Sequence, residues 1–216
     1  MAVRAWSETL AGLAAELGAR AAEPVEVARV ADVVVAAIPL RAFDSLPADA
    51  LAGKTVVDTA NYYPERDGHL TPLDAGDLTS SELVQRHLTR SQVVKAFNTI
   101  TPHQIGTLAR PAGAPDRSAL PLAGDDEGAK DQVTKLLDLL GFDVVDAGPL
   151  AGSWRCEPGT PAYIRPYLGE VPPMQVEDFL RWTTTTSGVV VPAERVAVLL
   201  GAAVRRDAGE VRLPSA

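Results

Sequence analysis

The side chains best suited to catalysis or ligand binding interrupt or follow apolar runs of the sequence. Lys95 stands inside the apolar segment 91–100, and a buried lysine is rare without a partner. We expect it to pair with Asp58 or Asp146, or else to reach an anionic ligand. Asn61 ends the apolar run of segment 54–64. Its carboxamide could bind a sugar or a ring of a ligand, or it could simply form a turn.

Other polar residues carry weaker signals. Asp125 and Asp126 could serve a metal ion or acid–base chemistry, but their place ahead of a predicted helix at 127–140 favours helix capping. His103 and the other two histidines fall in predicted loops or helix ends, and Cys156 is the single cysteine. The sequence therefore predicts no disulfide, no metal site and no nucleophile–base pair.

Composition sets the broad class of the protein. The 216 residues are 46% hydrophobic and 22% charged, as in ordinary globular proteins. A net charge of −8 argues against a general nucleic-acid binder, which needs clustered lysine and arginine. No apolar stretch approaches the ~20 residues that cross a bilayer, and no signal peptide is visible. We therefore expect a cytoplasmic protein with no membrane or nucleic-acid partner.

The functional residues must be positioned by a sheet. The run Val33–Ile38 is apolar on both alternating faces, which is typical of a strand buried between two layers of helix. Further strands are predicted at 54–64, 91–100, 120–126 and 142–148. Helices are predicted at 10–17, 24–30, 80–87, 127–140, 176–183 and 193–206, and segment 65–81 is predicted to be a loop.

This alternation of strands and helices predicts an α/β fold with a mostly parallel, Rossmann-like sheet and helices on both faces. We expect one domain over residues 1–150 and a small, mainly helical extension over 151–216. Ligands of such sheets bind just past the carboxyl ends of the strands. Ile38, Pro39, Leu40 and Arg41 follow the first strand, so they are candidates for binding, although Pro39 could merely end the strand.

Several segments together resemble the coenzyme F420-dependent NADP oxidoreductases, a family that uses a deazaflavin. They keep the family's order from about Leu10 to Leu150. The segments are "ADVVVAAIPLRAF", "LAGKTVVDTANYY", "SSELVQRHL", "VVKAFNTI", "LPLAGDDEGAK" and "LLGFDVVDAGPL".

The resemblance implies binding of NADP, and of F420 as a second ligand. It implies that residues 38–41 line the nicotinamide–ribose end, and that Arg4 matches the basic residue for the 2′-phosphate. Lys95 and Asn61 are candidates for contact with substrate and cofactor. The resemblance also places Asn98, Thr99 and Ile100 beside both rings, and Gly148 and Pro149 at the border of the deazaflavin pocket. Asn98 stands where some relatives have histidine, which leaves the second substrate open.

The sequence departs from the family at its start. A G-x-G-x-x-G turn, which holds a dinucleotide's pyrophosphate, is missing, and so is the strand before it. Without that strand, Val33–Ile38 would lie at an edge of the sheet, where apolar strands invite pairing with another chain. We therefore expect either that the natural polypeptide begins upstream of Met1 or that a partner covers this edge.

Three functions follow from these observations. The first is an NADP-dependent oxidoreductase that transfers a hydride to or from a deazaflavin and forms a homodimer. Because hydride transfer uses atoms of the cofactors, it needs no catalytic residue of the protein. The second is a non-catalytic Rossmann-like remnant that acts as a binding module. The third is a reductase of a small imine or carbonyl compound.

Overall fold

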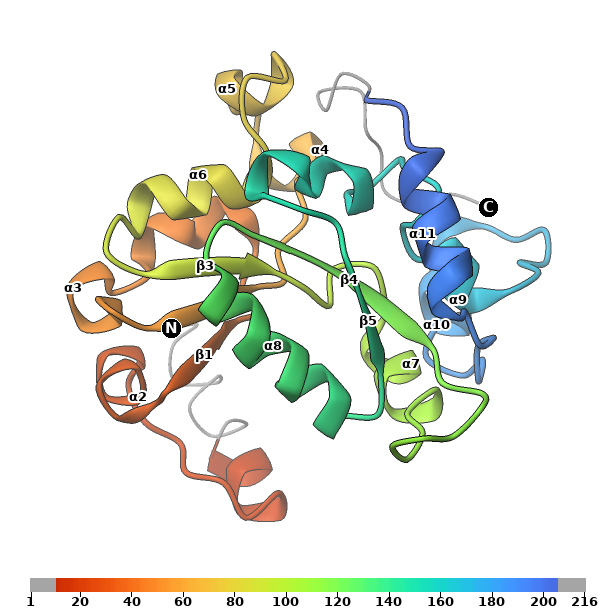
Figure 1. The fold of residues 1–216 in the computed structure, drawn as a ribbon, viewed down its shortest axis with the longest axis horizontal. Coiled ribbons are helices and arrows are strands. Elements are labelled where there is room, and N and C mark those ends of the chain that lie inside the picture. The colour runs from red at the N-terminus through yellow and green to blue at the C-terminus, as the bar shows by residue number, and fades with distance from the viewer. Residues whose placement is uncertain (1–10, 206–216) are drawn as a thin grey trace.

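The computed structural model describes residues 11–205 and shows a single five-stranded sheet. Its strands lie in the order β1-β2-β3-β4-β5 (Figure 1). They are β1 (Val33–Ala36), β2 (Thr55–Asp58), β3 (Gln92–Lys95), β4 (Ala119–Gly124) and β5 (Asp143–Asp146). The pairs β1–β2, β2–β3 and β4–β5 are parallel, and β3–β4 is antiparallel. The prediction of a mostly parallel α/β sheet is therefore confirmed.

The antiparallel pair splits the sheet into two parts that run in opposite directions. Strands β1, β2 and β3 send their carboxyl ends to one edge of the sheet. Strands β4 and β5 run the other way, with Val94 opposite Gly124 and Lys95 opposite Ala123. Only β1, β2 and β3 therefore end at the same edge of the sheet.

Neighbouring valines divide the interior between the two faces of the sheet. Val57 and Val94 belong to a core beneath helix α8 (Glu127–Leu139), whereas Val56 and Val93 belong to a core beneath helix α6 (Ser80–His87). This alternation is the pleat of a strand that is covered on both sides. Figure 1 shows α8 on one face of the sheet and α6 on the other.

Strand β1 departs from the prediction of full burial. Within the described residues it pairs only with β2, and Val35 is 50% exposed. The run of valines is therefore an edge strand with one partly open face, as expected for this sheet without a further strand.

Capping groups fix where the two covering helices begin. Asp126 accepts a hydrogen bond from the backbone N–H of Ala129 and so caps α8, as predicted. Helix α6 is capped by Thr79 through a capping box with Glu82. Asp125 instead accepts from the N–H of Leu150, which ties the start of α8 to the chain beyond β5.

The remaining helices are short and lie around this core. Segment 65–81, predicted as a loop, contains helical turns between polar bends. Helix α11 packs on β4 and β5, so the chain after residue 150 joins the same sheet. Residues 11–16 are helical. The other elements are α2 (Pro24–Val30), η1 (Leu40–Ser45, a 3-10 helix), α3 (Ala48–Leu51), α4 (Pro64–Asp67), α5 (Thr71–Asp74), α7 (Pro102–Thr107), η2 (Leu150–Cys156, a 3-10 helix), α9 (Arg165–Leu168), α10 (Val176–Trp182) and α11 (Ala193–Gly201).

Among the described residues, no helix combines the length and apolarity needed to span a membrane. The division into domains 1–150 and 151–216 remains a prediction.

Two glycines with left-handed backbones provide a test of this packing. Gly141 (φ +95°) ends α8, and a Cβ there would lie 2.7 Å from the backbone N of Arg110. Gly53 (φ +74°) has no atom within 4 Å of the same position. We expect Gly53→Ala to lower the free energy of unfolding by about 1–2 kcal/mol through backbone strain alone.

Gly141→Ala adds a steric clash to that strain, so we expect a loss of more than about 3 kcal/mol. Urea denaturation followed by circular dichroism measures both variants. Equal losses for the two would show that Gly141 is not packed against the 109–110 backbone.

Candidate functional site

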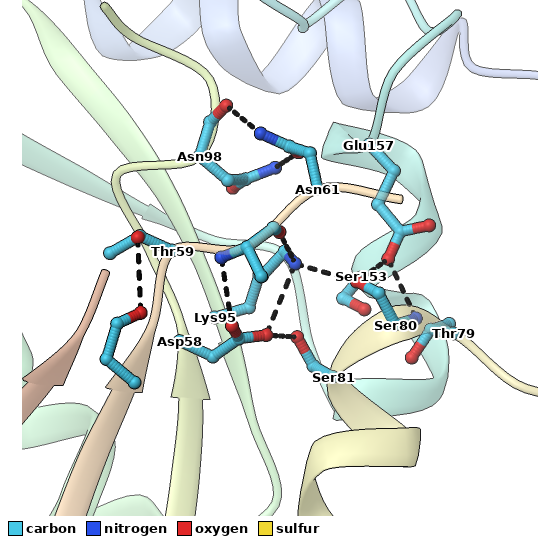
Figure 2. Close-up of polar contacts among 12 residues, drawn as sticks. Asp58, Thr59, Asn61, Thr79, Ser80, Ser81, Lys95, Asn98, Ser153 and Glu157 are labelled. Atoms are coloured by element: carbon cyan, nitrogen blue, oxygen red, sulfur yellow. Dashed lines mark hydrogen bonds and ion pairs between the residues drawn. The ribbon is translucent and has the colours of Figure 1, made fainter. Parts of the chain in front are cut away.

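The chain contains only two asparagines, and the fold brings them together. Asp58 and Lys95 are register partners in β2 and β3, so the segments that follow these strands leave the same edge side by side. Asn61 donates from Nδ2 to the backbone O of Asn98 at 3.1 Å. Asn98 donates from Nδ2 to Oδ1 of Asn61 at 3.2 Å (Figure 2). Two residues 37 positions apart thus form one reciprocal pair.

The two carboxamides differ in their burial and in the hydrogen bonds that they make. Asn98 is buried, and its Nδ2 also donates to the backbone O of Cys156 at 2.7 Å. Its Oδ1 is buried and has no hydrogen-bond partner among the described residues. Asn61 is only half-buried. A buried acceptor without a partner is costly, so an ordered water or a ligand group is expected to satisfy it.

The backbone around this pair adopts rare conformations. Phe97 has φ +62° and Ile164 has φ +49°, both in the region that side chains other than glycine rarely enter. Ile164 donates its backbone N–H to the O of Thr99 at 3.0 Å, so both unusual residues border the segment that carries Asn98. Such backbone strain clusters at functional sites in proteins.

Lys95 lies directly beneath the pair and is fully buried. Its Nζ donates to Oδ2 of Asp58 at 3.3 Å, to Oγ of Ser80 at 2.8 Å and to the backbone O of Ala60 at 2.5 Å. An ammonium has three N–H donors, and all three are used within the protein. The predicted pairing with Asp58 is therefore confirmed, and Asp146 instead pairs with Lys130 at 2.8 Å. The alternative that Lys95 reaches a bound anion remains a prediction, and it would require the ammonium to give up one of these partners.

The partners of Lys95 extend into a connected polar network (Figure 2). Asp58 also accepts from the N–H of Ala60 at 2.9 Å and from the hydroxyl of Ser81 at 2.6 Å. Glu157 accepts at Oε1 from the hydroxyl of Ser80 at 2.6 Å and from its N–H at 3.1 Å. The network thus links β2, β3, the first turn of α6 and the chain after η2.

The predicted residues after β1 are arranged differently from one another. Pro39 is exposed and begins η1, Ile38 is half-buried, and Leu40 is fully buried in the core beneath α6. Arg41 donates from Nη1 to the backbone O of Arg66 at 2.9 Å, which ties η1 to α4.

The other predicted residues divide between the asparagine pair and more distant places. Thr99 and Ile100 are buried in the segment that carries Asn98. Gly148 and Pro149 follow β5, which runs opposite to β3. Gly148 accepts from the N–H of Gly124 at 3.0 Å, and Gly124 lies opposite Val94, one residue before Lys95. A place for Gly148 and Pro149 at the border of a ligand pocket remains a prediction. Arg4 lies outside the described residues.

Two of the solved structures that resemble this chain are informative. One is a protein of Arthrobacter sp. FB24, provisionally named an F420-dependent NADP reductase, with 31% identity and a TM-score of 0.52. The match covers 61% of this chain and 62% of that protein, so the chain spans less than two thirds of that relative. The other is a hypothetical protein of Sinorhizobium meliloti, with 29% identity, a TM-score of 0.62, and coverage of 76% and 80% of the two chains.

A family model matches the first part of the chain. Residues 1–62 match the model described as NADP oxidoreductase, coenzyme F420-dependent. This part of the chain is therefore similar to the coenzyme F420-dependent NADP oxidoreductases. The matched range includes β1, β2, residues 38–41 and Asn61, so one of the two asparagines lies within it and the other beyond it. No curated protein matches the sequence.

Some residues beside the asparagine pair were missed by sequence reasoning. Tyr63 shares a hydrogen bond with the hydroxyl of Tyr163, and burial raises the pKa of both. Glu157 carried no signal at all, because its partner Ser80 is distant in sequence. Within residues 11–205, no group of three histidine, cysteine or acidic side chains could hold a metal ion.

Tyr62, the residue next to Tyr63, lies in the core beneath α6. Its hydroxyl donates to Asp74 at 2.6 Å. Burial and this bond raise the pKa of Tyr62 to about 12.

Cys156 offers a chemical probe of the site, because it is the only cysteine and its backbone O holds Asn98. Burial raises the pKa of its thiol to about 12, and the nearby Lys95 ammonium opposes this only partly. Since the thiolate is the reactive form, we expect folded protein at pH 8 to react with a thiol reagent at least ~1000-fold more slowly than unfolded protein.

A colour assay with and without guanidinium measures the two rates. The same shift predicts that stability falls as the pH rises from 9.0 toward 12, because only the unfolded chain then loses the thiol proton. Rapid labelling under folding conditions would show that the Cys156 segment opens readily and cannot hold Asn98.

Proposed function

We propose that this chain carries the ring-binding end of an NADP-dependent oxidoreductase whose second substrate is the deazaflavin F420. The match of residues 1–62 to the family model and the provisional name of the Arthrobacter protein support the reaction class. The observation that carries the assignment to a site is the reciprocal Asn61–Asn98 pair at the carboxyl edge of β2 and β3. Ligands of α/β sheets bind at such an edge.

The reaction requires little chemistry from the protein itself. The nicotinamide of NADP supplies or accepts the hydride when it is bound, and the enzyme must hold two flat rings at near-contact distance. Asn61 is half-buried and can offer an amide N–H to a ring carbonyl or a ribose hydroxyl. Oδ1 of Asn98 is a buried hydrogen-bond acceptor that has no donor among the described residues. These groups orient a ring without exchanging a proton with it.

The residues present fit one end of NADP better than the other. The carboxamide pair suits an amide or hydroxyl ligand, and the backbone at residues 38–41 follows the edge strand β1. In contrast, no G-x-G-x-x-G occurs in the sequence, so the turn that usually holds the pyrophosphate has no counterpart here. We therefore expect this chain to bind NADPH weakly and to depend on contacts with the ring.

Substitution of the asparagines tests the binding role directly. We expect Asn98→Ala and Asn61→Ala each to weaken NADPH or F420 binding by about tenfold, because one good hydrogen bond is worth about 1.4 kcal/mol. Energy transfer from tryptophan to NADPH reports one ligand, and F420 fluorescence reports the other. Gln132→Ala is the matched control, since it removes a carboxamide that bonds Thr55 at the opposite end of β2.

Unchanged affinity in both asparagine variants would remove the pair from the binding site. Wild-type protein that responds to neither ligand at millimolar concentration would favour the alternative of a non-catalytic binding module.

The identity of the second substrate needs a separate assay. We expect NADPH oxidation by the wild-type chain to depend on added F420, because the family name joins these two cofactors. Oxidation that instead requires a small imine or carbonyl compound would support that reductase activity in place of the deazaflavin reaction.

We also propose a homodimer and a cytoplasmic location. Leu180 in α10 is 56% exposed and Val198 in α11 is 59% exposed. Apolar side chains of this size are candidates for burial against a second subunit. Sedimentation of the purified chain reports the assembly state.

A further inference from the structure

Lys95 connects, through separate hydrogen bonds, to the segments that hold the two asparagines. On one side its Nζ donates to the backbone O of Ala60, the residue directly before Asn61. On the other side it donates to Oγ of Ser80, whose hydroxyl donates on to Glu157. Glu157 directly follows Cys156, whose backbone O accepts from Asn98.

The hydrogen bonds of Lys95 leave no N–H of its ammonium unused in this structure. All three donors of the ammonium are used, the side chain is fully buried, and the counter-ion Asp58 is held in turn by Ser81. A charge buried in this way fixes the relative positions of its partners, because moving any of them would strand the ammonium without an acceptor.

We propose that Lys95 is a positioning residue that sets the geometry of the Asn61–Asn98 pair from beneath the sheet edge. It acts on Asn61 through Ala60, and on Asn98 through Ser80, Glu157 and Cys156. This inference rests on the proposed function only in assigning the pair to ligand binding. The positioning itself is a property of the free protein and can be measured without a ligand.

The presence of only two asparagines makes the measurement direct. Selective ¹⁵N labelling of asparagine yields two pairs of side-chain carboxamide signals, one from Asn61 and one from Asn98. In Lys95→Met we expect both pairs to shift and their protons to exchange at least about tenfold faster with solvent. Single Asn→Ala variants assign the two pairs.

Lys54→Met is the matched control for the loss of a lysine. Its Nζ also donates to backbone carbonyls, those of Ala31 at 2.7 Å and Arg29 at 3.4 Å, but it precedes β2 at the other end of the strand. We expect neither carboxamide pair to change in this variant.

Ser80→Ala is a second variant that tests the same proposal if Lys95→Met does not fold. It keeps the Lys95–Asp58 pair and the bond to Ala60, and removes only the hydroxyl that leads to Glu157. We expect the Asn98 signals to shift more than those of Asn61. A general loss of stability would not produce this selectivity, so the result separates positioning from a merely structural role.

The outcomes distinguish this inference from the proposed function. Carboxamide signals that respond to Lys95→Met and Ser80→Ala support positioning, even if wild-type protein binds neither NADPH nor F420 and the proposed function fails. If both variants leave the carboxamide signals unchanged, the positioning role is overturned, whether or not the wild type binds a ligand.

Discussion

A buried ammonium needs an acceptor for every N–H, and Lys95 finds its three acceptors on two separate segments, with Asp58 and Ala60 at the end of β2 and Ser80 at the start of α6. Removing one partner of a buried ion pair typically costs about 3–5 kcal/mol, because the other charge is left without compensation. Asp58 and Lys95 are also register partners in adjacent strands. The ion pair therefore specifies how β2 and β3 align, and with them the segments that follow.

The direction of the strands explains why the site is confined to one part of the sheet. Only β1, β2 and β3 end at the edge where the two asparagines lie, because β3 and β4 are antiparallel. The chain after β5 returns to this edge by way of η2, where Cys156 and Glu157 contact Asn98 and Ser80. One half of the sheet thus supplies the strand ends, and the other half supplies the segment that closes over them.

The sequence predicted well those features that depend on residues close together along the chain. Paired valines such as Val56 and Val57 identify a strand covered on both faces, and Asp126 identifies the start of α8, because both signals depend on a few neighbouring residues. Lys95 was also recognised as needing a partner, since an apolar run leaves its charge unsolvated. The alternative of Asp146 could not be dismissed until the order of the strands was known.

What the sequence could not supply is the placement of residues that are far apart in the chain. The reversal of strand direction at β4 is one example, because it leaves no local mark in the sequence. Tyr163, Ser80 and Glu157 join the site only through tertiary contacts. The positive φ of Phe97 and Ile164 was likewise invisible, since neither residue type favours it.

The central claim is that Lys95 faces inward to hold the protein's own segments while the asparagine pair faces a ring. A crystal structure of the chain soaked with F420 or NADP tests it most directly. The account predicts density for a ring within hydrogen-bond distance of Asn61 or Asn98, with Nζ of Lys95 still on Asp58, Ala60 and Ser80. A ligand bound away from both asparagines, or an ammonium turned from Asp58 toward the ligand, would contradict it.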